Sequence, residues 1–114
     1  LYNNTSGQQN VALGRLAGNA NTTGNYNTFI GAGANPTVGT LAYATAIGYG
    51  AQVSQSNSLI LGGTGPSAVN VGIGTSAPLA ALTIARENAQ ANKWSGLHYL
   101  REDTPPENFF WNKR

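Results

Sequence analysis

The sequence predicts an all-β fold in which short coils of parallel strands stack into a β-roll, that is, a β-solenoid. A five-residue figure, ending in an aliphatic residue and Gly, returns five times between residues 10 and 74. Turn segments rich in Asn, Thr and Gly separate the copies, and successive positions within each copy alternate between two sides with period two. Such a short period cannot hold a helical hairpin repeat, whose units run to roughly 33 to 47 residues.

The copies are regularly spaced. Their final glycines are 17, 17, 14 and 12 residues apart, and they are Gly14, Gly31, Gly48, Gly62 and Gly74. The first three copies share a second anchor, at Ala17, Ala34 and Ala51. Because Gly adopts backbone conformations closed to other residues, we expect these five glycines to turn the chain tightly after each strand.

Within each copy the side chains alternate with period two, so two sets must point in opposite directions. We expect the set made up of Leu and Ile only to stack inside the coil as a core ladder of Leu13, Ile30, Ile47, Leu61 and Ile73. The other set includes Ala12, Ala46 and Gly72, although it also holds the bulky Phe29. This mostly small face suits close approach by another chain. Since one coil buries little by itself, stacking explains the repetition, and the narrow core predicts an oligomer.

The C-terminal part has a different composition. Of the ten Lys, Arg, Asp and Glu residues, only Arg15 precedes position 86. We therefore divide the chain into a β-roll repeat region at 1–76, a connector at 77–92 with a short strand at 82–84, and a C-terminal segment at 93–114. Aromatic residues and the one His gather in the last segment: Trp94, His98, Tyr99, Phe109, Phe110 and Trp111.

Two interpretations of that segment remain open. As a cap or trimer clasp, its aromatic side chains would cover the exposed strand edges at the end of the roll. As a tip, they would offer rigid contact area to a glycan or protein receptor.

The repeat unit at 21–24 with 27–31 and Ala34 resembles the head repeats of trimeric autotransporter adhesins and related repeats of bacteriophage tail fibres, over residues 3–76. Residues 70–75, followed by Pro78, Leu82 and Ile84, resemble the segment that leaves the repeat region of many phage fibres. The resemblance implies a left-handed parallel β-roll, a homotrimer around a common axis, and attachment to a host-surface glycan or protein receptor. It implies a location in a virion tail fibre or on a cell surface.

Several function classes fit the sequence poorly. The repeat region lacks the charge for nucleic-acid binding, and no apolar run approaches the ~18 residues of a membrane span. We expect no cofactor and no metal site, since the chain has no Cys and one His. The start at Leu1 instead of Met is typical of a fragment or processed product.

We also expect no enzymatic activity, because glycoside hydrolysis needs paired carboxyl groups and the first 85 residues have none. The main expectation is thus a structural phage tail fibre segment. A bacterial surface adhesin or filament subunit is the alternative with the same fold. A glycan-cleaving tailspike would have to use Glu87, Glu102, Asp103 or Glu107, and an ice-binding solenoid would use Thr28 and Thr45.

Overall fold

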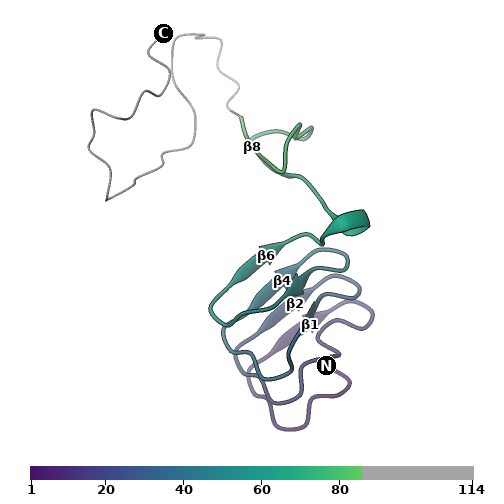
Figure 1. Cartoon of the computed structure of the whole chain (residues 1–114), viewed down its shortest axis with the longest axis vertical. Helices are drawn as coiled ribbons and strands as arrows, with labels where there is room; N and C mark the ends of the chain where they lie inside the picture. Colours follow the sequence, from purple (N-terminus) through teal and green to yellow (C-terminus); the bar gives the residue numbers. More distant parts are fainter. Residues whose placement is uncertain (86–114) are drawn as a thin grey trace, which may run out of the picture.

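A computed structural model describes residues 1–85 of the chain (Figure 1). Four short strands form one parallel sheet in the order β1 (Val11–Leu13), β2 (Thr28–Ile30), β4 (Thr45–Ile47) and β6 (Leu59–Leu61). Equivalent residues of successive copies are paired, as in Leu13 with Ile30 and Ile30 with Ile47. The shortened spacing before β6 keeps this register, because Ile47 pairs with Leu61.

Two further sides close each coil. Strand β3 (Asn35–Pro36) pairs with β5 (Gln52–Val53), also in parallel. On the turn side, the Thr5 N–H donates to the Thr22 carbonyl at 2.8 Å, and the Thr22 N–H donates to the Gly39 carbonyl at 2.9 Å. Backbone hydrogen bonds therefore join neighbouring coils all the way round, which confirms the predicted parallel β-solenoid.

The interior of the roll is filled mainly by Ala, with Phe29, Leu41 and Val53 as the larger apolar side chains. Phe29 and Ala46, at the centres of β2 and β4, are fully buried. The predicted second anchors Ala17, Ala34 and Ala51 are also buried. Phe29 lies in register between Ala12 and Ala46 of the two adjacent coils. Its ring also reaches Gly18, where an added Cβ would lie 2.8 Å away.

The predicted direction of the core ladder is wrong. Leu13, Ile30, Ile47 and Leu61 do stack in register, but on the outside of the coil, where Leu13 is 66% exposed and Ile47 36%. The face expected to meet another chain, with Ala12 and Ala46, instead lines the interior. The middle position of each three-residue strand points inward, so the first and third positions must point outward. The inward position holds Ala in β1 and β4 and a large side chain, Phe29 or Ile60, in β2 and β6.

The fifth copy of the figure does not extend the stack. After a short 3-10 helix, η1 (Gly65–Ser67), strand β7 (Val71–Ile73) pairs in parallel with β8 (Leu82–Ile84). Ile73 therefore lies opposite Ile84 and is not part of the ladder on β1 to β6. The strand expected at 82–84 is confirmed, and this small sheet lies beyond β6, past η1 (Figure 1).

Turn glycines adopt the expected conformation. Gly14, Gly31 and Gly48 have φ of 124°, 124° and 122°, and Gly62 and Gly74 also have positive φ. A Cβ on Gly31 would lie 2.5 Å from the Gly48 carbonyl oxygen. Only Gly combines this backbone conformation with such close approach between coils.

Buried Asn side chains form a ladder between coils. Asn27 is fully buried; its Nδ2 donates to the Leu41 carbonyl at 2.7 Å, and its Oδ1 accepts from the Ala44 N–H at 2.9 Å. One coil earlier, Asn10 Nδ2 donates to the Gly24 carbonyl at 2.7 Å and Asn10 Oδ1 accepts from the Asn27 N–H at 2.9 Å. The same side-chain amide thus satisfies the backbone of successive turns. Within residues 1–85, every buried side-chain nitrogen and oxygen has a hydrogen-bond partner.

Candidate interaction surface

The outward side of the β1–β2–β4–β6 sheet carries two columns of side chains. The column at the first strand position runs through Val11, Thr28, Thr45 and Leu59, and the column at the third position through Leu13, Ile30, Ile47 and Leu61. We call these eight residues the outer face. All are exposed or half-buried, as Leu59 at 60% and Val11 at 53% illustrate. A contiguous apolar surface of this kind marks an interaction site more often than a solvated face.

Thr28 and Thr45 are in register, as the ice-binding alternative requires. The same column, however, continues with Val11 on one side and Leu59 on the other. The Thr row is therefore confined to two coils of the outer face.

One lateral edge of the outer face carries a row of side chains placed two residues before each strand. The row consists of Gln9, Tyr26, Tyr43 and Asn57, and we call it the start edge. All four have φ between 56° and 59°, a region that L-residues seldom occupy. The rings of Tyr26 and Tyr43 are stacked, with centroids 5.0 Å apart and planes within 3° of parallel.

Hydrogen bonds between coils hold the start edge in place. The Tyr26 N–H donates to the Gln8 carbonyl at 3.0 Å, and the Tyr43 N–H donates to the Asn25 carbonyl at 3.2 Å. Asn25 also accepts at Oδ1 from the Gln8 N–H at 2.7 Å. Hydrogen bonds between coils thus hold the backbone that carries the two rings, and the rings stack on one another in addition.

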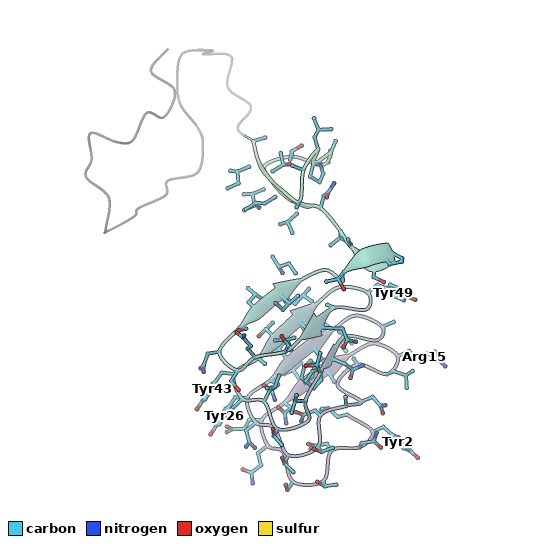
Figure 2. All side chains as sticks on the ribbon, viewed as in Figure 1. Tyr2, Arg15, Tyr26, Tyr43 and Tyr49 are labelled. Carbon is cyan, nitrogen blue, oxygen red and sulfur yellow. The ribbon has the colours of Figure 1, made fainter. Side chains whose placement is uncertain are left out.

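The opposite edge carries Arg15 and Tyr49, each placed two residues after a strand; we call this the end edge. Figure 2 shows Tyr26 and Tyr43 on one side of the roll and Arg15 and Tyr49 on the other. Tyr49 is 71% exposed. Arg15 is the only charged side chain in residues 1–85.

The β7–β8 sheet is also apolar and exposed. Val71 lies opposite Leu82 and Ile73 opposite Ile84, which repeats the spacing of the two columns on the outer face. Ile73 and Leu82 are each more than half exposed. A two-stranded sheet is marginally stable in water by itself. Contact of these side chains with another surface would stabilise it.

The described residues offer little for catalysis. Their titratable side chains are Arg15 and four tyrosines, and residues 1–85 contain no group of His, Cys, Asp and Glu that would hold a metal ion. A shallow hollow of about 600 Å³ lies at the N-terminal end of the roll. It is lined by Leu1, Tyr2, Asn3, Ala12, Gly14, Leu16, Ala17 and Asn19. In residues 1–85 no helix is long and apolar enough to cross a membrane.

The predicted contact residues of the C-terminal segment, Trp94, His98, Tyr99, Phe109, Phe110 and Trp111, lie outside the described residues. So do the four carboxylates of the tailspike alternative. The choice between cap and tip therefore stays a prediction, as do the ranges given for the connector and the C-terminal segment.

Sequence reasoning missed the two edges and the Asn ladder. One signal was present, because Tyr26 and Tyr43 are separated by the 17-residue period and so must stack. The same period separates Asn10 from Asn27 and Asn4 from Asn21. Nothing in the pattern indicates that these Asn side chains point inward, since Asn is ordinarily expected on exposed turns.

Comparison of the chain with models of known protein families, with characterised proteins and with solved structures gives no match.

Proposed function

We propose that this chain is a structural segment of a homotrimeric attachment fibre, most specifically a phage tail fibre. The observation that carries the proposal is the outer face, where exposed aliphatic side chains repeat in register over four strands. A partner that covers this face along its length must itself repeat at the spacing of the coils. Another copy of the same chain meets that requirement.

The size of the outer face supports assembly. Its aliphatic residues Val11, Leu13, Ile47, Leu59 and Leu61 are each between 36% and 66% exposed. Burying one such side chain fully contributes roughly 1.5–3 kcal/mol, so covering about half of each of five contributes roughly 4–8 kcal/mol per copy, before the cost of association is subtracted. A micromolar complex needs about 8 kcal/mol. The outer face is therefore a substantial part of an interface, and contacts beyond it must also take part.

The number of subunits and the attachment role rest on the resemblance to adhesin heads and phage fibres. Strands β7 and β8 favour the phage fibre over the bacterial surface adhesin. They form a separate two-stranded unit at the position where, by the resemblance, the chain leaves the repeat region. Their exposed aliphatic residues extend the surface that a partner would cover. In this proposal the segment provides reach, and residues 93–114 contact the host surface or close the end of the fibre.

The test is the solution mass of the 114-residue chain by light scattering, beside heated and unheated denaturing gels. We expect a mass of three times 11.8 kDa, with trimers that persist on the unheated gel. A folded monomer would contradict the proposal and return attention to solitary solenoids, for which thermal hysteresis would be measured next.

A further inference from the structure

We propose that the two lateral edges of the roll form a contact between neighbouring copies of this chain, with the start edge of one copy against the end edge of the next. The central contact joins Tyr43 of one copy to Tyr49 of its neighbour. This inference rests on the assembly proposed above and adds which surfaces meet and in what direction.

The start edge has a geometry that stability of the single chain does not explain. Positive φ favours Gly or Asn, and the same turn position holds Asn57 in the last coil. Tyr26 and Tyr43 occupy it nonetheless, with φ of 59° and 56°, and they remain 50% and 58% exposed. Strained, exposed aromatic side chains on a well-bonded scaffold point to a contact made by the rings themselves.

Each coil places one residue of each edge at the same level. Tyr43 lies two residues before β4 and Tyr49 two residues after it; likewise Gln9 lies two residues before β1 and Arg15 two residues after it. The strand between them crosses the outer face. The coils of β1 and β4 therefore present a start-edge side chain, two outer-face side chains and an end-edge side chain in a row. In the coils of β2 and β6 the matching end-edge positions hold only Ala32 and Gly63.

Symmetry then decides which edges meet. When copies are related by rotation about an axis parallel to the roll, each turns its outer face toward the axis. The start edge of one copy then lies beside the end edge of the next, at the same coil level. Tyr43 thus meets Tyr49, and Gln9 meets Arg15. This holds for any number of copies around such an axis. A two-fold axis perpendicular to the roll would instead bring start edge against start edge.

The chemistry of the two edges is complementary. Arg15 is the one cation of residues 1–85, and it stands level with Gln9, whose amide oxygen accepts hydrogen bonds. The ring of Tyr26 lies one coil away, roughly 4.8 Å along the axis, within reach of the long Arg side chain. The start edge carries no charge that would oppose the Arg15 guanidinium. Since the outer face between the edges is uncharged and apolar, the whole surface fits a second copy.

Site-specific cross-linking tests this arrangement, and the chain is suited to it because it contains no Cys. Three variants of the full chain are compared: Tyr43→Cys, Tyr49→Cys and the double variant. Each is treated with a short bis-maleimide after circular dichroism and light scattering have established its fold and mass. We expect the double variant to give linked dimers and closed rings on a denaturing gel, and each single variant to remain one chain.

The outcomes separate this inference from the proposed function. Cross-linking of Tyr43→Cys alone would place start edges together and overturn the parallel arrangement. An oligomer in which the double variant gives no linked chains would overturn the edge contact but leave the assembly standing. A monomeric wild-type chain would overturn both.

A second pair of variants keeps the test decisive if Cys at these positions prevents assembly. Tyr49→Ala removes an end-edge ring, whereas Tyr2→Ala removes another exposed ring, one that does not flank a strand of the sheet. We expect Tyr49→Ala to raise the concentration at which the oligomer dissociates by about fivefold or more, and Tyr2→Ala by less than about twofold. Equal effects of the two variants would overturn the inference.

Discussion

The two sides of the β1–β2–β4–β6 sheet are built from adjacent residues of the same short strands, yet they lie in opposite environments. The inward side holds Phe29 and Ala46, both fully buried, while the outward side holds their neighbours Thr28, Ile30, Thr45 and Ile47, which are half-buried or exposed. In most sheets the larger apolar side chains would mark the core. In this roll large side chains stand on both sides, since Phe29 points inward and Ile47 outward. The comparison teaches that position within the strand, rather than size or hydrophobicity, selects the inward set.

The largest effect is expected from a charge on the inward side. Ala46→Asp places a carboxylate in a site that is fully buried and surrounded by apolar side chains, with no cation nearby. Burying a carboxyl group there, either charged or neutralised by a proton, costs several kcal/mol, which is comparable to the whole stability of a small domain. We expect the variant to lose its β-sheet circular dichroism.

The matched control is Ile47→Asp, one residue further along β4. Because Ile47 points outward, its Asp replacement remains solvated in the single chain. We expect this variant to keep the β-sheet signal and to fall to the mass of one chain by light scattering. Loss of the β-sheet signal in Ile47→Asp but not in Ala46→Asp would reverse the assignment of the two sides.

A smaller effect is expected from emptying the interior. Phe29→Ala leaves a cavity among Ala17, Ala34 and Ala46, which are too small to fill it. Such replacements cost about 3–5 kcal/mol. Denaturant unfolding of the variant should show this loss, and Ile30→Ala on the outward side should lose clearly less under conditions where the chain is dissociated. Equal losses would mean that both sides are equally buried.

The smallest of these effects is expected at the Asn ladder. Asn27→Ala leaves the Leu41 carbonyl and the Ala44 N–H without their side-chain partner inside the roll. We expect a loss of about 1–3 kcal/mol in the free energy of unfolding. Asn3→Ala is the control, since the hydrogen bond from Asn3 Nδ2 to the Asn19 carbonyl is exposed. An equal loss in the free energy of unfolding for Asn3→Ala would show that burial does not increase the contribution of the Asn ladder to stability.

The sequence by itself determined the repeat and the stacking that the repeat requires. Equal spacing of equivalent residues is enough to place Leu13, Ile30 and Ile47 in one column. It also requires one shared backbone conformation at Gly14, Gly31 and Gly48, because every coil must turn in the same way to stack. The same 17-residue period places Tyr26 and Tyr43 in neighbouring coils, one above the other. The strand at 82–84 was also predictable, from its short run of β-branched and apolar residues.

Only the tertiary structure decided direction and partners. Period-two alternation separates two sets of side chains but does not say which set points inward, since that depends on the direction in which the chain turns after each strand. Whether the fifth copy stacks on β6 or pairs with β8 likewise depends on the path of the chain through η1. The two edges depend on how each coil closes. Only in the closed coil do the residues before and after a strand, such as Tyr43 and Tyr49, lie at one level on opposite flanks of the same face.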